Sequence, residues 1–261
     1  MKTLQKKFVS LVMVVVLVNF CMPVSADIDA PVSHWTFDEG DGTTAFDSAG
    51  SNNGAISGAT WTNGKINNAL NFSSDGAKVV IADSTSLDPI NAFTLSAWVN
   101  PSQFRGNGDQ NGNIILCKWA SNFTGQYLLN AFTGGNVNFR VSNGSAADLL
   151  TVNNALTINS WQHIAAEWNG EFIKIYVNGL LAGEKSTNIT SIYNHEYGDD
   201  YLAVGYGTGG AYPGWSFKGG IDDVRYYDYA LSGDEVYQLY QIPEPITMAL
   251  FALGAVFIRR K

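Results

Sequence analysis

WQHIAAEWNGEFIKIYVNGLLA, at residues 161–182, contains the strongest local folding signal in the chain. Its two Asn-Gly pairs, Asn169-Gly170 and Asn178-Gly179, separate three short segments. Asn and Gly accept the positive φ values of a type I′ turn, whose twist suits a two-residue β-hairpin. In the middle segment every second residue is Ile or Val, the period of a strand with one buried face. The stretch therefore predicts a three-stranded antiparallel meander.

Strand character continues through residues 34–231. Short runs rich in Val, Ile, Thr, Tyr, Phe and Trp recur between clusters of Gly, Asn, Ser and Asp. One short helix is expected near the end of this region, because SGDE at 232–235 is a capping box followed by the apolar residues Val236 and Leu239. With no long helical period elsewhere, the pattern predicts an all-β domain.

Charge and composition limit the possible partners. Hydrophobic residues make up 46% of the 261 residues and aromatic residues 13%, which argues against a disordered chain. Residues 27–242 carry nine Lys and Arg against 22 Asp and Glu, a net charge of −13. Because phosphate binding needs clustered basic residues, this balance argues against nucleic acid as a partner.

The N-terminus has the features of a secretory signal peptide over residues 1–26. Three lysines precede an apolar run too short to span a membrane, and Val24-Ser25-Ala26 supplies small residues for a signal peptidase. The mature chain would begin at Asp27; a retained N-terminal anchor is the alternative. Cleavage would remove Cys21 and leave only Cys117, which we expect to be a buried packing residue.

The C-terminus carries a second targeting pattern. Pro243, Glu244 and Pro245 precede the apolar run 246–258 and three basic residues. At about 1.5 Å per residue that run spans roughly 20 Å, short of a hydrocarbon core of about 30 Å. The pattern resembles the PEP-CTERM sorting signal of Gram-negative bacteria, and a C-terminal tail anchor is the alternative.

The PEP-CTERM resemblance implies a route of export. An exosortase would recognise residues 243–261 and remove them, after a transient membrane contact through 246–258. Proteins with this signal belong to exopolysaccharide-producing, biofilm-forming cells. We therefore expect an exported protein at the cell surface, in the outer membrane or in the extracellular matrix.

Four blocks resemble the laminin-G-like, concanavalin A-like domains of secreted bacterial proteins. They are HWTFDEG at 34–40, FTLSAWVNP at 93–101, the meander from residue 161, and FKGGIDDVRYYDYALS at 217–232. The resemblance implies that residues 27–242 form one jelly-roll sandwich of two antiparallel sheets. The short helix would end this domain, and the C-terminal hydrophobic segment would lie apart from it.

The sequence lacks the catalytic patterns of enzymes with this fold. A laminarinase-type hydrolase needs Glu-x-Asp-x-Glu on one strand, which places its carboxylates on one face, and no such run occurs. Alginate lyases of this fold use Gln-x-His, and Gln162-His163 lacks the intervening residue. His163 is more readily explained as a packed or hydrogen-bonded sheet residue. We therefore expect a protein that is not an enzyme.

Calcium is the cofactor that the laminin-G resemblance implies, as a structural ion at the edge of the sandwich. Carboxylate and carbonyl oxygens are its usual ligands. The positions that match are Asp38 in the first block and Asp222 or Asp223 in the last. In the alternative interpretation these aspartates only hydrogen-bond turns and strands.

Aromatic loops are the candidate glycan site. Tyr206, Tyr212 and Trp215 lie in Gly-rich segments where exposed rings could stack on sugars. The alternative is that these rings cover the edge of the sandwich. Trp98 and Trp161 fall in strand blocks, and we expect both in the core.

Together these features predict an exported, non-catalytic surface or matrix protein that binds glycans or exopolysaccharide, or that acts in adhesion. A structural or protein-binding surface component without a sugar site is the first alternative. A divergent polysaccharide-degrading enzyme is the second.

Overall fold

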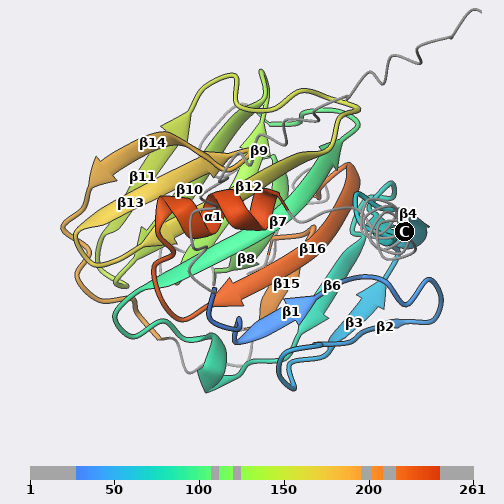
Figure 1. Ribbon diagram of the computed structural model, residues 1–261, viewed down its shortest axis with the longest axis horizontal. Coiled ribbons are helices and arrows are strands. Elements are labelled where there is room, and N and C mark those ends of the chain that lie inside the picture. Colours follow the sequence, from blue (N-terminus) through green and yellow to red (C-terminus); the bar gives the residue numbers. More distant parts are fainter. Residues whose placement is uncertain (1–27, 107–111, 120–124, 195–200, 208–215, 242–261) are drawn as a thin grey trace, which may run out of the picture.

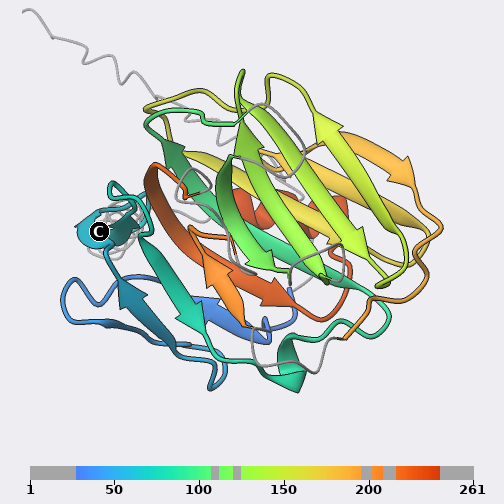
Figure 2. The same cartoon turned by 180° about the vertical axis from the view of Figure 1, so that it is seen from behind.

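The computed structural model describes residues 28–106, 112–119, 125–194, 201–207 and 216–241. They form two antiparallel sheets packed face to face, seen from opposite sides in Figures 1 and 2. Each sheet has eight strands among the described residues. This confirms the predicted all-β jelly-roll sandwich with one short C-terminal helix.

The first sheet has the strand order β14-β13-β12-β7-β16-β5-β4, and β1 also pairs with β16. Its strands are β14 (Leu180–Ser186), β13 (Phe172–Val177), β12 (Gln162–Trp168), β7 (Phe93–Pro101), β16 (Gly219–Tyr227), β5 (Asn68–Asn71), β4 (Thr60–Asn63) and β1 (Ser33–Trp35).

The second sheet has the order β11-β10-β9-β8-β15-β6-β3-β2. Its strands are β11 (Ala147–Val152), β10 (Asn136–Ser142), β9 (Tyr127–Phe132), β8 (Asn113–Lys118), β15 (Leu202–Val204), β6 (Lys78–Ile81), β3 (Gly54–Ser57) and β2 (Thr44–Ala45). A short 3-10 helix, η1 (Thr85–Leu87), lies between β6 and β7.

The predicted meander is strands β12, β13 and β14. Asn178 and Gly179 have φ values of 50° and 78°, as a type I′ turn requires. The first turn differs from the prediction. Of Asn169 and Gly170, only Gly170 has a positive φ. The Asn169 N–H donates to the Phe172 carbonyl (3.2 Å), so the central residues of that turn are Gly170 and Glu171. Glycine in the first central position is typical of a type II′ turn.

The main core lies between the two sheets and is rich in aromatic side chains. Phe93 of β7 packs against Tyr127 and Phe139 from the second sheet, and against Trp168 and Tyr226 from its own sheet, with ring centroids 4.9–6.2 Å apart. Rings at this separation add to the free energy gained from burying their apolar area.

Cys117 lies on β8, buried as predicted, and forms no disulfide. It belongs to a small apolar cluster with Ile114 and Leu128, separate from the main core.

Helix α1 (Gly233–Tyr240) lies across the outer face of the first sheet (Figure 1). The predicted capping box is present: the Glu235 N–H donates to Ser232 Oγ, and the Glu235 carboxylate accepts from the Ser232 N–H (2.7 Å). Tyr240 stacks on Trp98 at 5.7 Å between ring centroids. Trp98 is therefore buried as predicted, but it lies outside the main core. Among the described residues, no helix is long and apolar enough to cross a membrane.

His163 lies beneath the end of α1, where its ring contacts Trp98 and Tyr240. Its Nε2 shares a 2.8 Å hydrogen bond with Ser96 Oγ, and the residue is 1% exposed. Burial lowers the pKa of His163 from 6.5 to about 3, and the Arg225 charge acts in the same direction.

This lowered pKa predicts acid destabilisation. Below pH 6.5 His163 binds a proton in the unfolded chain but stays neutral in the folded chain. The stability due to neutral His163 therefore falls as the pH drops toward about 3. The contribution of His163 to stability should be about 2 kcal/mol smaller at pH 5 than at pH 7. Urea unfolding of the wild type and of His163→Gln at both pH values isolates it, because the other titrating groups are the same in the two proteins. The His163→Gln variant should lose at least 1 kcal/mol less over that range, and equal losses in both proteins would contradict this assignment.

Candidate functional site

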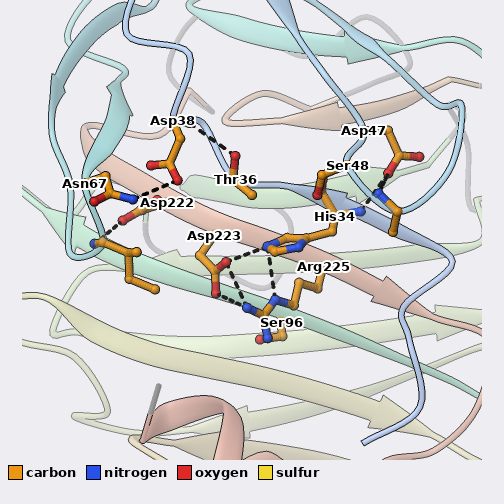
Figure 3. A network of polar contacts seen from close by, with 12 residues as sticks. His34, Thr36, Asp38, Asp47, Ser48, Asn67, Ser96, Asp222, Asp223 and Arg225 are labelled. Atoms are coloured by element: carbon orange, nitrogen blue, oxygen red, sulfur yellow. Dashed lines mark hydrogen bonds and ion pairs between the residues drawn. The ribbon is translucent and has the colours of Figure 1, made fainter. Parts of the chain in front are cut away.

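Two predicted metal-binding aspartates converge on the hairpin between β4 and β5 (Figure 3). Asp222 Oδ2 accepts a hydrogen bond from the Ile66 N–H (2.9 Å). The Asp38 carboxylate accepts from Asn67 Nδ2 (3.0 Å) and from the Asn68 N–H (3.2 Å). Residues from the start and the end of the domain thus hold one turn from two sides.

Gly64 permits this close approach. A Cβ on Gly64 would lie 2.6 Å from Asp222 Oδ2 and 2.4 Å from the Asn68 carbonyl oxygen. Any side chain at this position would therefore push the hairpin away from Asp222.

Asp222 is an unusual carboxylate. The residue is fully buried, and no hydrogen-bond partner for Oδ1 is found in the described part of the chain. Burial raises the pKa of Asp222 from 3.8 to about 8, and the charges of Asp223 and Asp38 raise it further. A buried carboxyl in this state is either protonated or in need of a cation.

The groups around Asp222 fit a calcium ion in kind. The Asp38 and Asp222 carboxylates are the hard oxygen donors that Ca²⁺ prefers, and their described contacts are with N–H donors of the β4–β5 hairpin. No group of three His, Cys, Asp or Glu side chains that could hold a metal occurs in the described ranges. An ion beside Asp38 and Asp222 would therefore need backbone carbonyls and water for most of its six to eight ligands.

Asp223, the third predicted ligand, is directed elsewhere. It occupies a bulge of β16 with φ 50°, and its carboxylate pairs with His34 Nε2 (2.6 Å) and with Arg225 (3.0 Å). Burial alone would raise the pKa of Asp223, but the His34 hydrogen bond and the Arg225 charge together lower it. Figure 3 shows the carboxylate directed toward these two partners.

A polar pocket of about 230 Å³ lies beside Asp222, across the ends of neighbouring strands in the first sheet. Its lining residues are Thr62, Asn63, Asn71, Asn100, Ser102, Asn159, Trp161, Gly219 and Gly220. Ile221 belongs to the main core, so its neighbours Gly220 and Asp222 both face outward. Asp222 and the Gly220 wall of the pocket therefore lie on the same, outer face of β16.

Trp161 forms the apolar wall of this pocket. A Cβ on Gly220 would lie 2.7 Å from the Trp161 ring, so the indole packs directly on the strand backbone. Trp161 is half-buried and is absent from the core clusters. The prediction of a core position for Trp161 is wrong, because the residue precedes β12 at the rim of the sheet.

The asparagine side chains that line the pocket have polar groups available to a ligand. No side-chain hydrogen bond engages the carboxamides of Asn63, Asn71, Asn100 or Asn159 within the ranges that the structure describes. Each carboxamide offers two donors and an acceptor. The pocket thus combines one aromatic surface with several uncharged hydrogen-bonding groups.

The aromatic residues predicted to bind glycan lie away from this pocket or outside the described residues. Tyr206 is half-buried, with Lys78 Nζ 5.2 Å from its ring centroid. Tyr212 and Trp215 lie outside the described residues, as do Pro243, Glu244 and Pro245. The asparagine pocket was not predicted from the sequence, although Asn63 and Asn71 at strand ends and the Gly219-Gly220 pair were available signals.

Two family models match the chain. Residues 72–237 match the model described as the concanavalin A-like lectin/glucanases superfamily, and residues 241–261 match the PEP-CTERM protein-sorting motif. No curated protein sequence matches.

Solved structures share the fold at low sequence identity. The binding domain of Paraclostridial Mosquitocidal Protein 1 is 16% identical with a TM-score of 0.62, covering 81% of this chain and 52% of that one. Domain 4 of AbnA, an extracellular arabinanase from Geobacillus stearothermophilus solved with arabinotriose, is 20% identical with a TM-score of 0.60, covering 81% and 98%.

The ligand-binding domain of botulinum neurotoxin serotype D, solved with N-acetylneuraminic acid, is 16% identical with a TM-score of 0.61, covering 82% of this chain and 51% of that one. The chain thus spans about half the length of the toxin domains it matches.

Proposed function

Because the chain belongs to the concanavalin A-like lectin/glucanases superfamily and ends in a PEP-CTERM sorting motif, we propose that it is an exported, non-catalytic glycan-binding protein. Its place of action would be the cell surface or the surrounding exopolysaccharide matrix of a Gram-negative bacterium. A signal peptidase and an exosortase would process its two ends.

The observation that carries this proposal is the asparagine pocket with its Trp161 wall. Sugars present hydroxyl groups that both donate and accept hydrogen bonds, which carboxamides match. Their rings also expose apolar C–H faces that pack on indole. Small-ligand sites are concave and combine apolar or aromatic walls with convergent polar groups, and this pocket has that combination with a larger share of polar groups.

The similar structures support this proposal at the level of fold. The arabinanase domain and the neurotoxin domain were both solved with sugars, and all three are binding domains or domains of larger proteins. A scaffold used repeatedly for recognition is consistent with a role in binding rather than in catalysis.

A calcium ion held by Asp38 and Asp222 is part of the proposal. The orphaned Oδ1 of Asp222 and its raised pKa support it. The ion would neutralise both carboxylates and fix the β4–β5 hairpin, which contributes Asn63 and Asn71 to the pocket. Its role would be structural.

Replacing Trp161 with Ala tests the site. On a broad panel of neutral and acidic glycans, the mature domain should bind at least one class, and Trp161→Ala should weaken that binding at least tenfold through loss of the stacking surface. Titration calorimetry with the best ligand measures it.

The matched control is Tyr237→Ala, an aromatic residue that is 41% exposed on α1 and does not line the pocket. It should bind as the wild type does. Absence of binding across the panel would favour a structural or protein-binding surface component. Release of reducing sugar would favour a polysaccharide-degrading enzyme.

A further inference from the structure

We infer that this pocket selects a single uncharged sugar ring and rejects sugar acids. The inference rests on the proposed glycan-binding function and narrows it to one chemical class of ligand. It follows from three properties of the site: its lining, its surroundings and its size.

The lining carries no charge. Of its nine residues, four are Asn, two are Thr and Ser, two are Gly, and one is Trp. Carboxamides and hydroxyls replace the water that a sugar hydroxyl loses on binding. They do not neutralise a carboxylate, and moving a carboxylate out of water without a cationic partner is costly. A uronic or sialic acid would leave its charge uncompensated here.

The surroundings are acidic. Residues 27–242 carry a net charge of −13. Such a field disfavours an approaching polyanion.

Neighbouring lysines are engaged. Lys218 Nζ pairs with Asp75 (2.8 Å), and Lys65 Nζ lies 5.1 Å from the centroid of the Trp98 ring. Neither of them lines the pocket. A bound calcium ion would reduce the repulsion, but it would leave the lining unchanged.

The volume of the pocket fits about one sugar ring. The pocket is open to solvent and has a volume of about 230 Å³, below the roughly 300–1,000 Å³ typical of pockets for drug-sized ligands. An oligosaccharide would place one unit against Trp161 and leave the others in solvent.

Paired ligands that differ only at C6 test the inference. Methyl β-galactoside and methyl β-glucoside are compared with the corresponding methyl uronides by ligand-observed NMR titration of the mature domain, in EDTA and in millimolar Ca²⁺. At least one neutral member should bind ten times more tightly than its acid. Its Kd should change less than twofold between 50 and 500 mM NaCl, because no ion pair contributes.

Adding a positive charge to the pocket should reverse its preference for neutral sugars, which gives a second measurement. Asn63 is exposed and lines the pocket, so Asn63→Lys should improve uronide binding at least tenfold relative to the neutral sugar. The control Asn91→Lys adds the same charge at an exposed position beyond the other end of β16, near Asp228, and should change neither affinity. Melting temperatures confirm that both variants fold.

The outcomes distinguish the inference about sugar charge from the proposed glycan-binding function. Uronides that bind as tightly as their neutral partners, through Trp161, would overturn the inference and leave glycan binding intact. If every ligand of the glycan panel and both members of each pair fail to bind, the proposed function itself is wrong.

Discussion

We expect millimolar Ca²⁺ to raise the melting temperature of the wild-type domain, and Asn in place of Asp222 to abolish that rise. The substitution keeps the shape of the side chain and an acceptor for the Ile66 N–H, but it removes the charge that would hold the proposed ion. A calcium titration followed by thermal unfolding measures the effect. A wild-type domain whose melting temperature is the same in Ca²⁺ and in EDTA would refute the calcium site.

Without calcium, the same variant should be more stable than the wild type at alkaline pH. The folded pKa of Asp222, about 8, lies above its ordinary value of 3.8, so the stability due to the neutral carboxyl is complete below 3.8 and is lost as the pH rises through 8. Asn stays neutral throughout. Above pH 8 in EDTA we expect Asp222→Asn to be more stable than the wild type by up to about 6 kcal/mol, the difference between pKa values of 8 and 3.8 at about 1.4 kcal/mol per pKa unit.

The calcium response should itself depend on pH. Below pH 8 the ion must displace the proton on Asp222, so the shift in melting temperature should be larger at pH 8.5 than at pH 5.5. Asp223→Asn is the matched control. It breaks the pair with His34 and Arg225 and should lower stability with or without calcium, while the calcium response remains.

Among the aspartates near the start of the domain, Asp47 should cause the largest loss of stability when it is replaced with Ala. The carboxylate of Asp47 is 8% exposed and accepts four backbone hydrogen bonds of 2.9–3.1 Å, from His34, Ala49, Gly50 and Asn52. Alanine would leave these N–H groups unpaired, each at a cost of about 1 kcal/mol or more where water cannot reach. We expect a total loss of about 3 kcal/mol or more in urea unfolding at pH 7.

Two further variants calibrate this measurement. Asp47→Asn keeps one acceptor oxygen and should fall between the wild type and Asp47→Ala. Asp41→Ala removes an exposed carboxylate nearby and should change stability by less than about 0.5 kcal/mol. A loss below 1 kcal/mol for Asp47→Ala would show that the loop rearranges to pair its amides without the carboxylate.

Local signals in the sequence predicted the elements that depend on neighbouring residues. The Asn178-Gly179 turn and the Ser232–Glu235 capping box need only residues two or three positions apart, and both are present. The Asn169 turn shifted by one residue, because the Asn169 side chain accepts from the Phe172 N–H (2.8 Å) and stabilises a different turn. Short-range patterns thus identified the hairpin but not its central residues.

The pocket depends on contacts that the sequence does not display. Trp161 is distant in the chain from Gly220, and only the pairing of β12, β7 and β16 brings them together. A tryptophan next to a strand is apolar enough for the core, and nothing local shows that it lies at the rim. The convergence of Asp38 and Asp222 was expected from the family resemblance alone. The orphaned oxygen of Asp222 becomes visible only in three dimensions.

Cys117, the one cysteine in residues 27–242, provides a probe of local opening of the domain. Because Cys117 is 2% exposed and forms no disulfide, a labelling reagent reaches its sulfur only when the β8 region opens. Labelling rates therefore report that opening directly. With no cross-link to make or break, the oxidant level outside the cell should leave the domain's folding equilibrium unchanged.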